Sequence, residues 1–176
     1  MKMTAGGFSI LRQKFGSLSQ TQVDGINHIV TAIDQDKSIS YPQAAYMLAT
    51  TWHETNRTMQ PVKEFGSDFY LRSKPYYPYI GYGYVQLTWE PNYRKVGKKL
   101  GLDLLNDPEL ALKPDVAVKI MIQGMKEGWF TGKKLSDYIY QSKKDYFSAR
   151  RIINGTDKAL LIAGYADTFE KALRSW

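Results

Sequence analysis

The sequence predicts a mainly α-helical fold with one irregular, tyrosine-rich stretch between its second and third helices. Apolar residues recur at helical spacing through most of the chain, and residues that cap or break helices stand where that spacing stops. The chain has 176 residues, of which 43% are hydrophobic, so one domain spanning residues 1–176 can bury its own core.

Two helices are predicted in the first third of the chain. Ser19 and Gln22 have the spacing of a capping box, and the apolar residues after them predict a helix from Gln20 to Gln35. Pro42 is a favoured first-turn residue and predicts the start of a second helix, which ends near Glu54. The apolar face of this second helix comprises Ala44, Ala45, Leu48 and Trp52.

The middle of the chain lacks the helical spacing of apolar residues seen before it. Residues 64–83 combine glycines, prolines and a cluster of tyrosines, which predicts loops or short strands. Residues 84–89 fit either a short strand or the entry to a helix, and a third helix is predicted from Pro91 to Leu100.

Further helices are predicted in the C-terminal part. One begins at Pro114, a short one covers 133–140, and another covers 145–153. Asn154 and Gly155 are expected to end the latter with a left-handed cap, and a last helix follows over 158–173.

Composition narrows the function classes. The net charge of +7 favours polyanions such as nucleic acid, anionic membranes or bacterial wall polymers. The basic residues are spread along the chain and form no Lys/Arg-rich tract, which argues against a nucleic-acid partner. The absence of cysteine excludes disulfides, Cys-based zinc sites and a Cys nucleophile.

Other site types leave no signature in the sequence. His28 and His53 have no second ligand at helical spacing, and neither an H-E-x-x-H nor a G-x-S-x-G motif occurs, so we expect no metal and no cofactor. No stretch approaches the ~20 apolar residues of a membrane span, so no stable membrane insertion is expected. Residues 1–16 lack the apolar run of a signal peptide, which predicts synthesis in a cytoplasm without export by that route.

Glu54 is a candidate acid catalyst. A carboxyl at the C-terminal end of an apolar helix is partly desolvated and lies beside the negative end of the helix dipole, and both effects favour its neutral form. A carboxyl that keeps its proton can protonate a glycosidic oxygen, for which a second carboxylate is required. Glu64, Asp68 and Glu90 are candidates for that second group, and the pattern also fits an ordinary solvated glutamate at position 54.

Three segments resemble motifs of family 19 glycoside hydrolases, in that family's order. Residues 45–55, AYMLATTWHET, resemble its catalytic helix with the H-E-T signature. Residues 79–89, YIGYGYVQLTW, followed by Asn92 and Tyr93, resemble its Y-x-G-R-G-x-x-Q-L-T/S-W stretch, and residues 151–155, RIING, resemble its I-N-G segment. The resemblance covers the chain from about residue 20 to residue 173.

The resemblance implies a lysozyme-like, two-lobed helical fold with a central cleft and an inverting mechanism. Within it, Glu54 matches the general acid and Glu64 the second carboxylate, with Asp68 as a substitute. The residues expected to bind sugar or to orient water are Gln86, Thr88, Asn92, Asn154 and Tyr84. Simpler structural roles remain open, since Asn154 also suits a helix cap and Thr88 a backbone contact.

One position departs from the family pattern. Tyr82 stands where the family usually has the Arg of G-R-G, which helps to organise the carboxylates near the acid. Its loss is expected to favour the acid's neutral form or to transfer the pairing to another arginine. The candidates for that role are Arg57, Arg72 and Arg94.

The short chain, the missing cysteines and the segment 166–173 resemble the phage endolysin branch of the family. This resemblance implies a monomeric N-acetylmuramidase that cleaves β-1,4 bonds of bacterial peptidoglycan after release from the host cytoplasm, with anionic envelope polymers as possible further partners. A chitinase and a non-catalytic wall-binding module remain alternatives.

Overall fold

The computed structural model describes all residues 1–176 and contains eight α-helices and two short two-stranded antiparallel sheets. The α-helices are α1 Ala5–Phe15, α2 Gln20–Asp34, α3 Tyr41–Glu54, α4 Asp68–Arg72, α5 Glu90–Leu100, α6 Pro114–Glu127, α7 Leu135–Tyr138 and α8 Ala159–Leu173. Two 3-10 helices, η1 Pro108–Leu112 and η2 Ser148–Ile152, join them. The strands are β1 Val62–Lys63, β2 Tyr82–Gly83, β3 Ile139–Tyr140 and β4 Lys143–Lys144. The mainly helical fold is confirmed.

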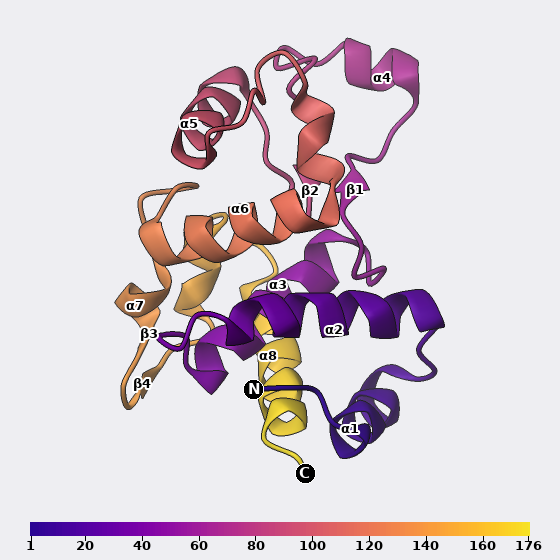
Figure 1. Ribbon diagram of the computed structural model, residues 1–176, viewed down its shortest axis with the longest axis vertical. Helices are drawn as coiled ribbons and strands as arrows, with labels where there is room; N and C mark the ends of the chain where they lie inside the picture. Colours follow the sequence, from indigo (N-terminus) through magenta and orange to yellow (C-terminus); the bar gives the residue numbers. More distant parts are fainter.

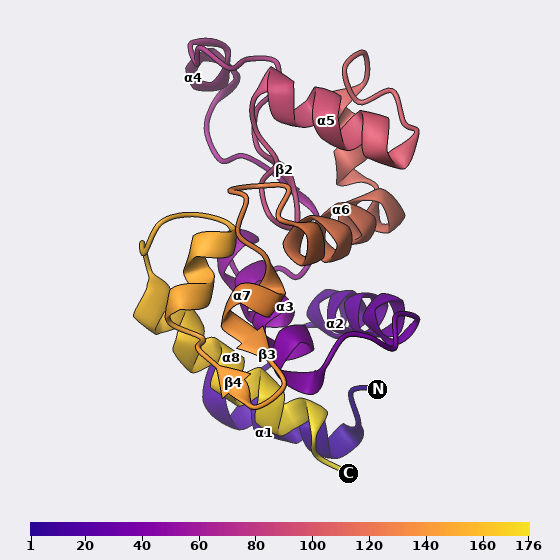
Figure 2. The ribbon, with the colours of Figure 1, turned by 90° about the vertical axis from the view of Figure 1, so that its left-hand side faces the viewer.

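A large lobe is built around α3. This helix contacts α2, α6 and α8, and α8 also packs against α1 (Figures 1 and 2). Every residue from Ala44 to Trp52 is buried, on all sides of the helix and not only on the predicted apolar face. The surrounding helices explain this burial, so the C-terminal end of α3 is held by the core of the large lobe.

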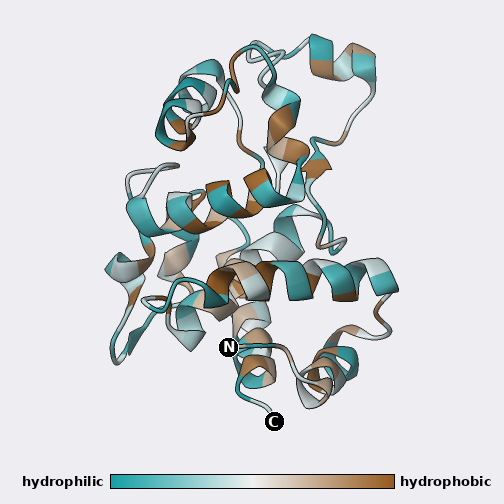
Figure 3. Ribbon diagram, in the orientation of Figure 1, coloured by the Kyte–Doolittle hydropathy of each residue, from teal (hydrophilic) through white to brown (hydrophobic).

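A small lobe has its own apolar cluster. Its buried residues come from α4, α5, η1 and the β1–β2 region and include Leu71, Ile80, Tyr93, Val96 and Leu104. Helix α6 lies between the lobes, and its polar and apolar residues alternate along its length (Figure 3). Met121 belongs to the large core and Ile120 to the small one. The two lobes are therefore joined through one shared helix.

The irregular region contains a small two-stranded antiparallel sheet formed by β1 and β2. Val62 pairs with Gly83, Lys63 pairs with Tyr82, and Tyr82 also forms a bridge with Leu87. Gly83 has a φ of 100°, which favours glycine and lets the chain turn back on itself. Residues 84–89 are consequently not a strand: they form a tight turn that returns through the bridge at Leu87 and then enters α5, whose N-cap is Trp89, so the helix-entry alternative is confirmed.

The C-terminal predictions hold in part. In place of the helix predicted over 133–140, the structure has the shorter helix α7 followed by strand β3. In place of the helix predicted over 145–153, it has the 3-10 helix η2. The prediction of a left-handed cap at Asn154–Gly155 is wrong, because neither residue has a positive φ. The turn is closed instead by the backbone N–H of Asn154, which donates to the carbonyl of Arg150 at 2.9 Å. The left-handed residue is Lys158, with a φ of 58°, directly before α8.

Helix α1 was not predicted, because Gly6 and Gly7 weaken the helical signal. Both glycines allow close packing against the C-terminal region: a Cβ on Gly7 would lie 2.6 Å from the carbonyl oxygen of Ala172. Thr4 caps the helix by accepting a hydrogen bond from the N–H of Gly7 at 3.0 Å. None of the helices combines the length and the apolar character needed to cross a bilayer.

Candidate active site

A cleft of about 610 Å³ lies where the two lobes meet. Its large-lobe side includes the end of α3 and the segment after η2, and its small-lobe side includes the β1–β2 region and the start of α5. The predicted residues that line it are Glu54, Glu64, Gln86, Thr88, Asn92 and Asn154. Segments spread over about a hundred residues of sequence therefore converge on one cavity.

Glu54 is the last residue of α3 and forms an ion pair with Arg150. The Nη1 atom of Arg150 donates to Oε1 of Glu54 at 2.7 Å, and the exposed fractions of the two side chains are 3% for Arg150 and 17% for Glu54. The Nε atom of Arg150 donates to the carbonyl of Asp157 at 2.8 Å, which fixes the guanidinium in place. A buried and fixed cation therefore lies directly against the carboxyl group of Glu54.

The arginine beside the acid is not one of the three that the sequence suggested. Arg57 lies with its guanidinium 5.6 Å from the ring of Trp52, and Arg94 pairs with Glu90 on α5. Arg72 lines a separate hollow on the small lobe. Arg150 directly precedes the RIING segment, and this neighbourhood was the only signal in the sequence that could have identified it.

The chain reversal after Glu54 is tightly built. Buried Thr55 donates from Oγ1 to the carbonyl of Thr51 at 2.7 Å and accepts from the N–H of Met59 at 3.1 Å. A Cβ on Gly25 of α2 would lie 2.1 Å from the carbonyl oxygen of Met59, so only glycine permits this approach. The end of α3 is therefore anchored on the side away from the cleft.

Glu64 faces Glu54 across the cleft and accepts two hydrogen bonds. Tyr76 donates its hydroxyl to Oε1 at 2.6 Å, and the N–H of Gly81 donates to Oε2 at 2.9 Å. Burial and the hydrogen bond to the carboxylate raise the pKa of Tyr76 to about 12, so the phenol stays a donor at neutral pH. The two donors suit an ionised carboxylate, whose oxygens have further lone pairs free for water.

The other candidate carboxylates lie outside the cleft. The side chain of Asp68 is 83% exposed, and its nearest cation is the Nζ atom of Lys63 at 3.6 Å. Glu90 is held by Arg94 at 2.7 Å and lines a separate hollow along α5. Of the three candidates, Glu64 alone shares a cavity with Glu54.

The polar residues of the small-lobe side support one another through the backbone. Gln86 donates to the carbonyl of Val62 at 2.9 Å, Thr88 donates to the carbonyl of Gln86 at 2.9 Å, and Asn92 donates to the carbonyl of Thr88 at 2.8 Å. On the opposite side, Asn154 accepts from the N–H of Gly155 at 2.8 Å. Each side chain thus has a structural role and still faces the cleft, while its role toward a sugar stays a prediction.

Tyr84 does not line the cleft, so its prediction as a substrate-binding residue is wrong. Its side chain is 1% exposed and belongs to the core of the large lobe, and burial raises its pKa to about 12. The turn at Gly83 directs the next side chain into the core and away from the cavity. Tyr82, which replaces the family's arginine, lies in the apolar cluster of the small lobe.

Two features of the cleft were not predicted. Trp89 is 49% exposed, and its ring lies 5.1 Å from that of Tyr76, which gives the small-lobe side an aromatic surface suited to the apolar face of a sugar. His53 lies beside Glu54, and its pKa is lowered by burial, against the opposing effect of the Glu54 carboxyl. Both residues stand inside the quoted motifs, where no separate role was assigned to them. The structure contains no group of three or more His, Asp and Glu side chains arranged to hold a metal ion.

Sequence comparison relates the chain to plant endochitinases. It is 33% identical over 121 residues to an acidic endochitinase of Dioscorea japonica, a match that covers 64% of this chain and 46% of that protein. It is 31% identical over 125 residues to an endochitinase of Arabidopsis thaliana, covering 67% of this chain and 41% of the relative. A shorter match, 47% identical over 47 residues, links it to an inactive chitinase-like protein of Hevea brasiliensis, with 23% and 15% coverage. The chain spans less than half the length of these relatives, and no family model matches it.

Solved structures establish the fold. Chitinase C from Streptomyces griseus superposes with a TM-score of 0.66 at 21% identity, covering 94% of this chain and 90% of that one. A bacterial family 19 chitinase gives a TM-score of 0.60 at 23% identity, with coverage of 96% and 94%. The chain therefore has the fold of these chitinases over nearly its whole length, which agrees with the predicted two-lobed helical architecture.

Proposed function

We infer that this chain is a glycoside hydrolase of the family 19 chitinases, a placement that its fold and its similarity to endochitinases support. We propose further that it hydrolyses the β-1,4 bonds of a glycan of N-acetylated amino sugars by an inverting acid–base mechanism. One observation carries the proposal: Glu54 and Glu64, from different lobes, line the same cleft in different environments. Two carboxyl groups set apart in this way are what glycoside hydrolysis requires.

In the proposed mechanism, Glu54 is the general acid. Arg150 occupies Oε1, so Oε2 is the oxygen that carries the proton to the leaving group. As the proton departs, negative charge grows on Glu54, and the buried guanidinium stabilises it without any rearrangement. The ion pair then contributes chiefly in the transition state, where the acid is becoming a carboxylate.

Glu64 is the proposed general base. Its hydrogen bonds from Tyr76 and Gly81 fix the carboxylate, and its free lone pairs accept a proton from a water that attacks the anomeric carbon. Inversion requires room for this water, which corresponds to a carboxyl separation of about 6.5–9.5 Å in the productive complex. The attack takes place on the face opposite to the leaving oxygen, so a β-linked substrate first yields the α-anomer.

Bacterial peptidoglycan is the proposed substrate. The net charge of +7 supports an anionic target, since peptides and associated polymers of the wall carry negative charge and chitin does not. The cysteine-free composition and the resemblance of residues 166–173 to phage endolysins support the same assignment. We propose accordingly that the protein acts as a monomer on the wall after release from the cell that makes it.

Chitin is the second candidate, and it is favoured by the endochitinase relatives. The inactive relative from Hevea brasiliensis also makes a non-catalytic glycan-binding protein a defined alternative. The three possibilities differ in their products, so one digestion experiment separates them.

The experiment is mass spectrometry of fragments released from purified peptidoglycan and from N-acetylglucosamine hexamer, with Glu54→Gln as the control. The proposal expects peptidoglycan fragments with muramic acid at the reducing end. Cleavage of the hexamer alone would establish a chitinase. Pelleting with the wall without any fragments would establish a binding protein and would overturn the catalytic proposal.

A further inference from the structure

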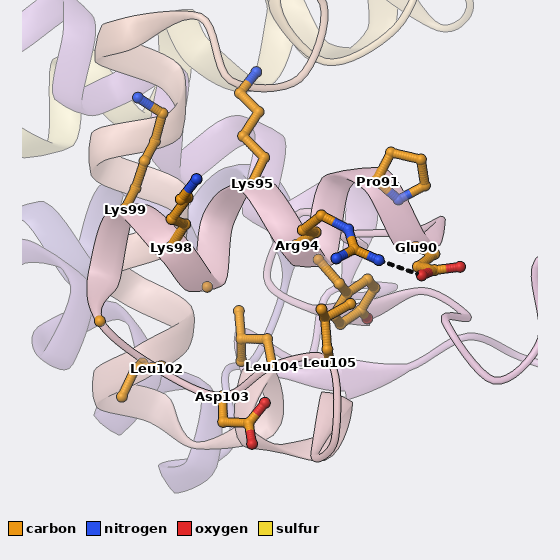
Figure 4. A pocket seen from close by; sticks show the side chains of 13 residues that line it. Glu90, Pro91, Arg94, Lys95, Lys98, Lys99, Leu102, Asp103, Leu104 and Leu105 are labelled. Carbon is orange, nitrogen blue, oxygen red and sulfur yellow. Dashed lines mark hydrogen bonds and ion pairs between the residues drawn. The ribbon is translucent and has the colours of Figure 1, made fainter.

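A second and larger cavity lies on the small lobe, outside the cleft. It is an open groove of about 1060 Å³ formed by α5 and the loop that follows it, and it shares no lining residue with the cleft. Figure 4 shows Arg94, Lys95, Lys98 and Lys99 along α5, with Leu102, Asp103, Leu104 and Leu105 on the loop that runs below the helix.

The charged residues that line this groove are four cations, Arg94, Lys95, Lys98 and Lys99, and two acids, Glu90 and Asp103. Helical spacing places Arg94 one turn from Lys98 and Lys95 one turn from Lys99, roughly 6 Å apart along the axis. Arg94 is paired with Glu90, whereas the three lysines form no ion pair. Lys95 donates to the carbonyl of Trp129 at 2.9 Å, which orders its side chain. With four cations against two acids, the groove keeps a net positive charge, and none of the three lysines is neutralised by an ion pair.

We propose that the α5 groove binds a linear polyol-phosphate polymer of the bacterial envelope. Phosphates that recur along a flexible chain match the repeated ammonium groups, while the half-buried Leu102 and Leu105 contact the carbon backbone between them. The choice of the bacterial envelope as the source rests on the proposed function, whereas the preference for a phosphate polymer rests on the groove alone.

The groove fits this polymer better than it fits nucleic acid or a membrane. Single-stranded nucleic acid binds through exposed aromatic rings, but the aromatic residues here, Tyr93 and Trp129, are 0% and 4% exposed. A flat bilayer requires projecting apolar side chains, whereas Leu104 is 0% exposed and lies at the bottom of a concave surface.

The groove and the cleft lie on the same helix, so binding at the groove can hold the cleft near its substrate. Asn92 of α5 lines the cleft, and Arg94, two residues later on the same helix, lines the groove. A polymer held on one side of α5 would therefore keep the cleft on the other side close to the glycan to which such polymers are attached. Binding at the groove would raise the local substrate concentration without taking part in the reaction.

The test is isothermal titration calorimetry of the full chain with purified poly(glycerol phosphate), free of peptidoglycan. The double variant Lys98→Gln/Lys99→Gln should bind roughly 10-fold or more weakly, and the slope of log K against log salt should flatten by roughly one per lysine removed. The matched control, Lys119→Gln/Lys171→Gln, removes the same charge from exposed positions on α6 and α8 and should bind like the parent.

Three results would overturn the proposal: equal losses in the two double variants, tighter binding to a single-stranded oligonucleotide, or tighter binding to phosphatidylglycerol vesicles. Cleavage of soluble oligosaccharide by the groove variant, measured in parallel, should remain at the parental rate. The calorimetry measures polymer binding and does not depend on hydrolysis. Failure of the proposed catalytic function would appear as no cleavage of oligosaccharide, whereas failure of the groove proposal would appear as no binding of the polymer.

Discussion

Arg150 and Glu54 are 96 residues apart in sequence, yet the guanidinium donates a hydrogen bond to the carboxylate at 2.7 Å. Arg150 is itself tied to the carbonyl of Asp157 in the segment that leads into α8. The predicted acid is therefore positioned by two distant parts of the chain, namely the end of α3 and the residues around η2.

The first prediction concerns this pair. Arg150→Ala should lower kcat about 10²-fold or more, because the cation that stabilises the developing carboxylate is lost. Arg150→Lys should retain more activity, since it keeps the charge but not the planar two-point attachment. Equal losses of kcat in Arg150→Ala and Arg150→Lys would indicate a purely structural role for Arg150.

The second prediction separates the two carboxylates of the small lobe. Glu64→Gln should reduce kcat by about 10²–10⁴-fold, because an amide cannot take a proton from water. Asp68→Asn should keep nearly full activity, because that exposed side chain has only a weak surface contact with Lys63. Initial rates on a soluble oligosaccharide measure both variants. A greater loss in Asp68→Asn would transfer the base role to Asp68.

The third prediction concerns the pH dependence of stability. Burial lowers the pKa of His53, so the unfolded chain binds this proton at a higher pH than the folded one. Its contribution to stability is present above the unfolded value near 6.5 and is lost as the pH falls through the lowered folded value. Urea unfolding at pH 7, 6 and 5 should thus show a smaller decline in His53→Gln than in the parent.

His28→Gln is the matched control for this measurement. His28 lies on α2, 3.5 Å from Asp115 and away from the cleft. The His28→Gln variant should lose as much free energy of unfolding between pH 7 and pH 5 as the parent, because His53 is still present. The account of His53 fails if His53→Gln follows the same pH dependence as the parent.

Much of the framework was predictable because its signals are local. The capping box at Ser19 and Gln22 is present in the structure, as are helices beginning near Pro42 and at Pro114. The location of Glu54 at the end of a buried helix follows from the same local pattern. Helix periodicity and caps depend on neighbours within a few residues, so a sequence displays them directly.

The missed features depend on tertiary packing. Arg150 meets Glu54 only through the association of η2 with the end of α3, and nothing in its own segment marks that contact. Tyr84 stands in a motif whose neighbours face the cleft, but the turn at Gly83 sends its side chain into the core. The glycines of α1 look like helix breakers until the close approach of the C-terminal residues is known.

The most direct test of the account is the rate of reducing-end release by Glu54→Gln from soluble oligosaccharide and from purified peptidoglycan. Glutamine keeps the shape of the side chain and an oxygen for Arg150 but has no acidic proton to give. We predict a loss of about 10²–10⁴-fold from acid catalysis in a variant that still unfolds cooperatively on heating, with a lower midpoint because Arg150 loses its buried partner. A folded variant with nearly the parental rate would contradict the assignment of Glu54 as the acid.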